Sequence, residues 1–557
     1  MEHYLQLKKS NCKNCYKCIR NCPVKSIRFS DNQANIVSNE CILCGNCFIV
    51  CPQNAKQVRN DLPAARALIA SGAPVYASIA PSFIANFSLR DFGKMETALK
   101  QLGFAGAEET AIGATLVKKE YEKMISSGQH SIILSSCCPT VNTMIEKYYP
   151  DVLQYLAPVL SPMQAHCKLI KEQHPEAKTI FIGPCISKKA EADAIPGLVD
   201  CALTFEELSE WMEQEGVLFE AGQPEDDFGR RARYFPTTGG IIRSMFTEDT
   251  DFDYIAVDGL DNCISAIQEV ERGAIQDCFI ELSACVGSCI NGPVMNRSRQ
   301  NRLNSQLAVN NFAGSVDFET PLVSNEDMEK RFSFSGPPHQ MPGNRAIEEV
   351  LAKMGKHSPE DELNCGSCGY NTCREKAIAV CMGKADLSMC LPYLKEKAES
   401  FSDTIISNTP NVIIVMNEAL EVQQVNEAAV HFLGLKQASD IVGEPIVHIL
   451  NPAEYMNVML TGKNVYEKPY YLAEYERYVE ETIIYDKAYK IIITLMRDVT
   501  EETKANEEKT RSRQQTAEIA DKVIEKQMRV VQEIASLLGE TTAETKIALT
   551  ELKESLQ

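Results

Sequence analysis

Residues 132–139 read IILSSCCP, a short apolar run that ends in two adjacent cysteines and a proline. Two further stretches have the same form: residues 179–189, TIFIGPCISKK, and residues 279–289, FIELSACVGSC. Each apolar run predicts a buried strand, and each cysteine group follows its strand directly. Because the active sites of open α/β sheets gather at the carboxyl ends of the strands, these distant cysteines are predicted to converge.

The segment that contains the three motifs, residues 57–300, alternates predicted strands with predicted helices. The strands are Val75–Ala80, Ile132–Leu134, Thr179–Ile182, Tyr254–Val257 and Phe279–Leu282. Helical periodicity is clearest over Ala111–Ile125 and Phe205–Glu215. This alternation predicts an α/β domain.

The whole chain of 557 residues carries a formal charge of -20 and 22 cysteines. Its length predicts several domains, and its charge argues against binding nucleic acid or anionic membranes, which need basic patches. Met1–Ser10 is polar, and no apolar run reaches about 18 residues, so neither a secretory signal nor a membrane span is expected. A cytoplasmic location keeps thiols reduced, so the clustered cysteines indicate metal sites rather than disulfides.

Residues 1–56 contain the pattern C-x2-C-x2-C-x3-C-P twice. Thiolates at this spacing suit iron–sulfur clusters, and the fourth cysteine of each run ligates the other cluster. One 4Fe–4S cluster is therefore assigned to Cys12, Cys15, Cys18 and Cys51, and the second to Cys41, Cys44, Cys47 and Cys22. The segment resembles a bacterial two-cluster ferredoxin, which transfers electrons. A pair of zinc knuckles is the alternative.

Four cysteines of the central motifs form a candidate four-thiolate site: Cys138, Cys185, Cys285 and Cys289. Gly287 and Gly292 would allow the backbone to approach a cofactor closely. In order and form, the motifs resemble the signatures of the iron-only (FeFe) hydrogenases. Those signatures are a double cysteine before proline, a P-C-x-x-K motif and an A-C-x-G-x-C motif.

The resemblance implies a two-lobed α/β catalytic domain that holds an H-cluster. In that cofactor the four cysteines hold a 4Fe–4S cluster, and the cysteine matching Cys289 bridges to a two-iron subcluster with carbon monoxide, cyanide and a bridging dithiolate amine. Ala80-Pro81-Ser82 matches the segment that contacts one cyanide, and Lys188 matches the lysine that hydrogen-bonds the other. Cys137 matches the thiol that exchanges protons with the amine. Cys137, Lys188 and Ser82 are thus the expected catalytic residues for heterolytic, reversible splitting of dihydrogen, in which iron acts as the Lewis acid.

The sequence departs from the family along the proton path, which there continues through two glutamates upstream of the double cysteine. Alternative alignments put Val117 and Glu120, or Leu116 and Lys119, in those two places. At least one carboxylate is missing in either case, which predicts slow turnover. Gly183 and Ser283 stand where the family has methionines that pack around the cofactor.

A 4Fe–4S cluster without the two-iron part, as in hydrogenase-like assembly proteins, is the alternative for the central site. The presence of Cys137, Lys188 and Ala80-Pro81-Ser82 argues against it, because in the family these residues serve the two-iron part. The cysteines outside any motif are predicted to be small buried apolar residues: Cys167, Cys201, Cys263, Cys278 and Cys381.

Residues 301–343 are polar and contain Pro337, Pro338 and Pro342, which predicts a linker. Residues 344–398 hold a third cysteine group with the spacing C-x2-C-x4-C-x16-C: Cys365, Cys368, Cys373 and Cys390. This group resembles the small 4Fe–4S domain found in several redox complexes. A zinc site and a disulfide are the alternatives.

Residues 399–500 predict a separate α+β domain. An apolar strand at Val412–Val415 precedes a helix, and a late strand at Ile491–Leu495 runs into Asp498-Val499-Thr500. This order resembles a PAS sensor domain, with a plain α+β domain as the alternative. His431 and His448 are expected on the surface or in the core rather than on a haem.

Residues 501–557 are highly charged and carry apolar residues at coiled-coil spacing: Ile519, Val523, Val530, Ile534 and Leu537. This seam, which Gly539 interrupts, predicts a signalling helix that forms a homodimer. A single amphipathic helix packed on the body is the alternative. The tail contains neither a histidine nor a nucleotide-binding motif, so a signal would pass to a separate kinase or phosphatase.

Together these features predict a multidomain α/β and α+β protein: ferredoxin, hydrogenase, small 4Fe–4S, PAS and coiled-coil segments. The predicted function is that of a slow, sensory hydrogenase that relays a dihydrogen or redox signal and exchanges electrons with a redox partner such as ferredoxin. The alternatives are a metabolic ferredoxin-linked hydrogenase and a non-catalytic iron–sulfur redox sensor.

Overall fold

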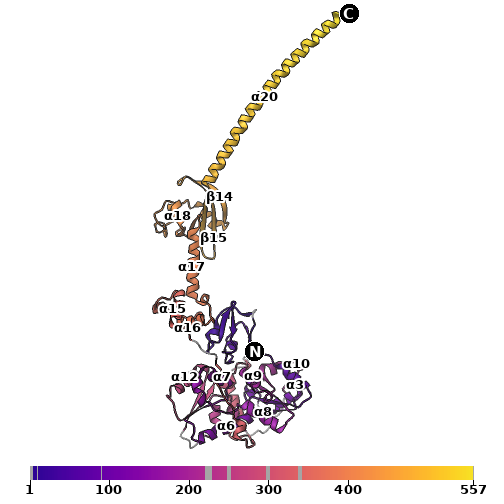
Figure 1. Ribbon diagram of the computed structural model, residues 1–557, viewed down its shortest axis with the longest axis vertical. Coiled ribbons are helices and arrows are strands. Elements are labelled where there is room, and N and C mark those ends of the chain that lie inside the picture. Colours follow the sequence, from indigo (N-terminus) through magenta and orange to yellow (C-terminus); the bar gives the residue numbers. More distant parts are fainter. Residues whose placement is uncertain are drawn as a thin grey trace. The chain divides into compact units, whose positions relative to one another are not determined.

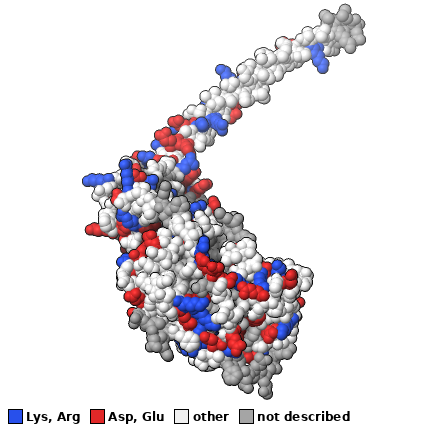
Figure 2. Space-filling model, turned by 60° about the horizontal axis from the view of Figure 1, so that its bottom comes forward, with Lys and Arg blue, Asp and Glu red and all other residues white. Residues whose placement is uncertain are grey.

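The computed structural model describes residues 4–8, 11–89, 91–219, 229–246, 252–296, 302–336 and 341–555. The chain divides into two compact units, Met1–Leu394 and Lys395–Gln557 (Figure 1). Within the described ranges, no helix is both long and apolar enough to cross a membrane. On the face drawn in Figure 2, Lys and Arg are interspersed with Asp and Glu rather than gathered into one basic patch.

The N-terminal segment is built from two small antiparallel pairs of strands. β1 (Leu5–Leu7) pairs with β4 (Lys56–Val58), and β2 (Ile27–Ser30) pairs with β3 (Gln33–Ile36). Each cysteine run ends in a one-turn helix, α1 (Lys17–Arg20) or α2 (Asn46–Ile49), and the two helices contact each other. The pairing of β1 with β4 joins the two ends of the segment and brings its two cysteine runs together.

Two parallel sheets follow. The first has the order β6-β5-β8-β9, with β6 at Gly106–Glu109, β5 at Val75–Ile79, β8 at Lys178–Gly183 and β9 at Cys201–Thr204. The second has the order β10-β11-β7, with β10 at Asp253–Asp258, β11 at Cys278–Ser283 and β7 at Ile132–Leu134. All five strands expected from apolar runs are confirmed, with ends that differ by at most one residue.

Helices cover the sheets, and two of them begin where a cysteine motif ends. α7 (Pro139–Tyr148) follows Cys138, and α9 (Ser187–Ala194) follows the Cys185 turn. The remaining helices of this region are α3 (Leu62–Ala70), α4 (Phe83–Phe87), α5 (Gly93–Gln101), α6 (Ala111–Ser126), α8 (Pro162–Gln173), α10 (Phe205–Glu215), α11 (Gly240–Ser244) and α12 (Leu260–Glu271).

The expectation of a linker over residues 301–343 is wrong for most of the segment. α13 (Arg302–Phe312) contacts α4, and its Val309 and Phe312 are buried in the apolar core of the four-stranded sheet. The Phe312 ring meets the Phe83 ring edge-on, 5.5 Å between centroids. Two apolar residues three positions apart are enough to dock a helix on an existing core, although the segment as a whole reads as polar. Pro337 and Pro338 lie outside the described residues.

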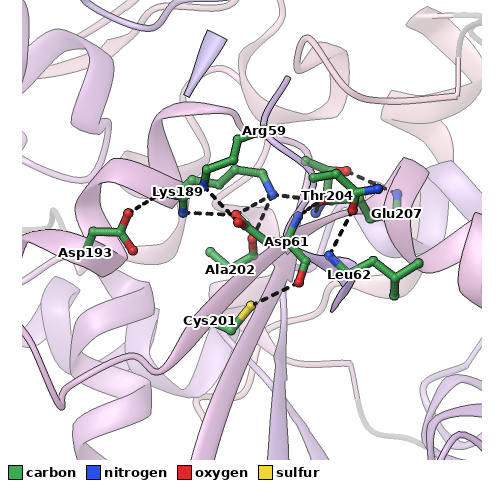
Figure 3. Close-up of polar contacts among 10 residues, drawn as sticks. Arg59, Asp61, Leu62, Lys189, Asp193, Cys201, Ala202, Thr204 and Glu207 are labelled. Atoms are coloured by element: carbon green, nitrogen blue, oxygen red, sulfur yellow. Dashed lines mark hydrogen bonds and ion pairs between the residues drawn. The ribbon is translucent and has the colours of Figure 1, made fainter. Parts of the chain in front are cut away.

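A buried ion network joins the end of the ferredoxin-like segment to the four-stranded sheet (Figure 3). The Lys189 ammonium, on α9, donates to Asp61 Oδ2 at 2.8 Å and to Glu207 Oε2 at 2.8 Å. Arg59 holds the other side of Asp61, with 2.8 Å between Nε and Oδ1. The Lys189 side chain is only 1% exposed, so removing it would leave the carboxylates without their buried cation.

The second unit contains an antiparallel sheet with the order β13-β12-β16-β15-β14. Its strands are β12 (Val412–Asn417), β13 (Val422–Val425), β14 (Val465–Leu472), β15 (Arg477–Asp486) and β16 (Ile491–Asp498). Two helices, α18 (Glu427–Phe432) and α19 (Ala453–Thr461), lie between β13 and β14 in the sequence, and α17 (Leu391–Asn408) precedes β12. The expected strands at Val412–Val415 and Ile491–Leu495 are therefore confirmed.

One continuous helix, α20 (Thr500–Ser555), ends the chain. It runs through Gly539, so the expected interruption does not break the helix; a single internal glycine costs only about 1 kcal/mol. The five seam residues from Ile519 to Leu537 are all exposed. Within the second unit, this face of α20 is therefore not packed against the sheet.

We expect Lys189→Met to lower the free energy of unfolding by about 3–5 kcal/mol, because it leaves buried carboxylates uncompensated. Lys100→Met is the matched control, since the Lys100–Glu96 pair is exposed and its loss should cost less than about 0.5 kcal/mol. Denaturant unfolding followed by circular dichroism measures both. Equal stability of the two variants would contradict the importance of the network.

Candidate metal centres

One cavity of about 110 Å³ lies between the two parallel sheets and is lined by the four cysteines of the candidate site: Cys138, Cys185, Cys285 and Cys289. Cys138 follows β7 and Cys285 follows β11, both in the three-stranded sheet, whereas Cys185 follows β8 of the four-stranded sheet. Cys289 lies in the short helix Ser288–Asn291. The strand ends of two sheets thus bring together residues that are far apart in the sequence.

The buried thiols of this cavity oppose one another's ionisation. The pKa of Cys289 is raised to about 12, chiefly by burial and in addition by the nearby Cys138 and Cys185. Burial and the neighbouring cysteines raise the pKa of Cys285 as well. Four thiolates can therefore coexist here only if bound metal compensates their charge.

Among the described residues, no three or more His, Cys, Asp and Glu side chains are grouped so as to hold a single metal ion.

The structure shows why residue 292 must be glycine, which the sequence did not reveal. A Cβ at this position would lie 2.5 Å from the carbonyl oxygen of Pro184, so only glycine lets the Cys289 segment pack on the Cys185 turn. The expectation was a close approach to the cofactor, and the close approach observed is to Pro184. Gly287 has a φ of 81°, in the left-handed region that favours glycine.

The other predicted residues also line the cavity: Ala80, Pro81, Ser82, Cys137 and Lys188. The Ser82 hydroxyl is buried and, within the described part of the chain, has no hydrogen-bond partner. A buried hydroxyl without a partner is unfavourable unless a bound group supplies one.

Lys188 lines the cavity, and hydrogen bonds hold its ammonium in place. Its ammonium donates to Ser161 Oγ at 3.1 Å and to Glu191 Oε2 at 2.6 Å, and Lys330 holds the second oxygen of Glu191 at 2.8 Å. Burial alone would lower the pKa of Lys188, but the Glu191 carboxylate raises it, so Lys188 stays charged. An ammonium has three donors, and Ser161 and Glu191 account for two of them.

Cys137 contacts a hydroxyl rather than a carboxylate. The Tyr121 hydroxyl lies 3.3 Å from Cys137 Sγ and also accepts the Ser136 N–H at 2.9 Å. Of the aligned positions, Val117 is fully buried and Glu120 pairs with Lys123 at 2.6 Å. In the other alignment Leu116 is buried and Lys119 donates to Thr320 at 2.8 Å. Sequence reasoning missed Tyr121, although it lies one helical turn after Val117 on α6.

Glu281 is a second residue that sequence reasoning missed. It is buried on β11 and accepts the N–H groups of Ile241 at 3.0 Å and Ile242 at 3.2 Å. Burial raises its pKa to about 7, against the effect of these hydrogen bonds. The sequence signal for Glu281 was a single carboxyl residue within an otherwise apolar predicted strand.

The N-terminal cysteines approach the cavity from one side. Cys22, Cys41, Cys44 and Cys47 line one small pocket, as the assignment to the second cluster expects. Burial raises the pKa of Cys18, and so do its neighbours Cys15 and Cys12, which places these three together. Cys51 accepts the N–H of Ala55 at 3.3 Å. Cys44 also lines the central cavity, so the second cluster site adjoins it.

The third cysteine group surrounds a pocket of its own, lined by Cys365, Cys368, Cys373 and Cys390. It is packed beside α15 (Asn344–Lys353) and α16 (Cys373–Cys381). Arg20 donates to the Gly366 carbonyl at 3.1 Å, which ties this group to the first cysteine run. All 22 cysteines are free thiols, so the disulfide alternative is wrong. Of the five outside any motif, all but the half-buried Cys381 are buried.

Three segments of the chain match known protein families. Residues 73–293 match the family described as "Iron only hydrogenase large subunit, C-terminal domain". Residues 4–52 match a 4Fe-4S dicluster domain, and residues 361–392 match an Fe-S cluster family. The expected hydrogenase-like and ferredoxin-like domains are therefore confirmed.

Three curated relatives show the range of the similarity. Iron hydrogenase 1 of Clostridium pasteurianum is 27% identical over 294 residues, which are 42% of this chain and 51% of that protein. The NADP-reducing hydrogenase subunit HndD of Solidesulfovibrio fructosivorans is 25% identical over 332 residues, 47% of this chain and 56% of that protein. The cytosolic iron-sulfur assembly component 3 of Rattus norvegicus is 23% identical over 341 residues, 47% of this chain and 71% of that protein.

The chain spans about half the length of the two hydrogenases that it matches. The similarity covers both parallel sheets and the cavity between them, together with the cysteine groups on either side in the sequence. The chain therefore contains a domain like the iron-only hydrogenase large subunit, flanked in sequence by two iron–sulfur domains.

Proposed function

We propose that this chain reversibly binds and heterolytically splits dihydrogen, slowly, as a sensory iron-only hydrogenase. One observation carries the proposal: a single cavity collects four mutually repelling thiols, the Cys137 thiol, the Lys188 ammonium and the partnerless Ser82 hydroxyl. These groups are of the types that an anionic iron cofactor with cyanide ligands requires.

The residues present fit such a cofactor. Cys138, Cys185, Cys285 and Cys289 would hold the 4Fe–4S part, with Cys289 shared with the two-iron part. The Ser82 hydroxyl and the third donor of Lys188 would bind its cyanide ligands. When bound, the cofactor supplies Lewis-acid iron and a nearby base for splitting dihydrogen.

Cys137 would hold the exchanging proton at Sγ. Burial raises its pKa to about 12, so it stays protonated and can donate. Its neighbour Tyr121 has a pKa that burial raises well above the usual value, so this hydroxyl gives up a proton reluctantly. A tyrosine in place of a carboxylate supports slow turnover, which suits a sensor.

Electrons would pass between the cavity and three further 4Fe–4S clusters. The second N-terminal site adjoins the cavity through Cys44, and Arg20 ties the third domain to the first cysteine run. This succession of neighbouring sites supports electron exchange with a redox partner such as ferredoxin.

The second unit would report the state of the cavity. Its strand order, with two helices between β13 and β14, supports the interpretation as a PAS domain. Thr500 starts α20, and its hydroxyl accepts the N–H of Tyr478 on β15 at 2.9 Å, so sheet and helix are directly joined. The exposed seam on α20 supports a homodimer that signals to a kinase or phosphatase.

A non-catalytic iron–sulfur sensor is the second candidate. The similarity to the cytosolic iron-sulfur assembly component favours it, since that protein matches over 341 residues, 47% of this chain. The two candidates differ in the two-iron part, so infrared spectroscopy separates them.

We expect the full chain to contain about sixteen irons for four 4Fe–4S clusters, and about eighteen with a two-iron part. Cys373→Ser should remove about four irons, because it opens the third site. Cys381→Ser, at the other end of α16, should leave iron content unchanged. Iron and acid-labile sulfide analysis measures this, and equal loss from both variants would contradict the assignment of Cys373.

After maturation, we expect infrared bands from iron-bound carbon monoxide and cyanide. Cys137→Ala should keep the bands but lower dihydrogen turnover by about a hundredfold or more, because the proton donor is lost. Cys278→Ala, a buried cysteine at the start of β11, should change neither. A matured sample without these bands rules out the proposed catalysis.

For the C-terminal helix, we expect the combined change Val530→Asp and Ile534→Asp to convert a dimer to a monomer, because charges would be buried in the seam. Gln532→Asp, on the opposite face of α20, should leave the dimer intact. Light scattering after size exclusion measures the mass. A parent chain that is already monomeric would refute the homodimer.

A further inference from the structure

Four connected polar side chains, of which one lines the cavity, remain without a role. The Thr110 hydroxyl lines the cavity and lies 2.8 Å from the Ser78 hydroxyl. Ser78 Oγ lies 2.8 Å from His166 Nδ1, and His166 Nε2 lies 3.2 Å from Glu108 Oε2. We call these residues, Thr110, Ser78, His166 and Glu108, the His166 relay.

The His166 relay extends from the cavity to the protein surface. His166 and Ser78 are completely buried and Thr110 is 4% exposed, whereas the Glu108 side chain is 29% exposed. One end therefore meets the cavity and the other end meets solvent.

The fold positions each member rigidly. Ser78 and Glu108 are directly opposite each other in the parallel pairing of β5 with β6, and His166 enters from α8. A Cβ at Gly113 on α6 would lie 2.8 Å from the His166 backbone nitrogen, so glycine is needed for the close packing of α6 on α8. Thr110 begins α6, directly after β6.

We propose that the His166 relay is a proton route between the cavity and solvent; this inference rests on the proposed function. Hydroxyl and imidazole groups both donate and accept hydrogen bonds, as a relay requires. For each proton that leaves the cavity, the Thr110 proton moves to Ser78 and the Ser78 proton moves to Nδ1. The Nε2 proton then moves to Glu108, which releases it to water.

One proton enters and one leaves, and no electrons move along the relay. Rotation of the hydroxyls and of the imidazole ring restores the starting arrangement, and the reverse order brings protons in. The relay would thus supplement the Tyr121 side of the cavity, where the expected carboxylates are missing.

The charges around Glu108 suit its position at the solvent end. Its hydrogen bond to His166 lowers its pKa, against the effect of burial, and His174 lowers it further. Burial raises the pKa of Cys167, beside Ser78, to about 12, so this thiol stays neutral. The next residue of β6, Glu109, forms an ion pair with Arg233 at 2.5 Å and so is bound outside the relay.

The test compares His166→Phe, Glu108→Gln and the control His130→Phe in the matured full chain. His130 lies between α6 and β7, at the opposite end of α6 from Thr110, so phenylalanine there leaves the relay intact. We expect the first two variants to keep the carbonyl and cyanide bands and to lose at least about tenfold in dihydrogen turnover. The control should retain the parent rate.

A second readout does not depend on turnover. Infrared titration of the Glu108 carboxyl band, identified by its loss in Glu108→Gln, should move to higher pH in His166→Phe, because the hydrogen bond that favours the carboxylate is gone. Parent-like turnover of both relay variants, or equal loss in His130→Phe, overturns the relay. If His166→Phe fails to fold, the half-exposed Glu108→Gln decides. If the unmutated chain lacks the carbonyl and cyanide bands, the proposed function is refuted rather than the relay. If the Glu108 titration does not move in His166→Phe, the contact between Glu108 and His166 is refuted.

Discussion

Four cysteines line one cavity, where burial and neighbouring cysteines raise the pKa of Cys138, Cys285 and Cys289. The pKa of Cys289 rises to about 12 for these reasons, so the site becomes a set of thiolates only when metal compensates the charge. The thiols reach the cavity from two sheets, with Cys185 from one and Cys138 and Cys285 from the other. The relative position of the two sheets therefore determines whether a cluster can bind at all.

α9 connects this requirement to the rest of the first unit. Lys188 lines the cavity, while the next residue, Lys189, is buried between Asp61 and Glu207. Because Asp61 follows directly after the ferredoxin-like segment, the same helix positions a cavity cation and anchors that segment. The helix thus fixes the position of a cavity-lining cation relative to the cysteine-rich N-terminal segment.

Hydroxyl and imidazole groups, and not carboxylates alone, lie at and behind the cavity. Cys137 contacts the hydroxyl of Tyr121, and the Thr110 hydroxyl connects the cavity through Ser78 and His166 to Glu108. Under the proposed function, such groups would pass protons slowly, which would suit a sensor better than bulk turnover.

The sequence by itself determined the strands and the cysteine groups, because apolar runs and cysteine spacing are local patterns. It also indicated that at least one of the usual glutamates is missing before Cys137. It could not show that α13 docks on the core, since that contact rests on few residues, Val309 and Phe312 with the partly buried Ala308. Tyr121 and the His166 relay were likewise decided by tertiary structure alone. Their members come from β5, β6, α6 and α8, and only the register of a parallel sheet and the close packing of two helices bring such distant polar atoms within hydrogen-bond distance.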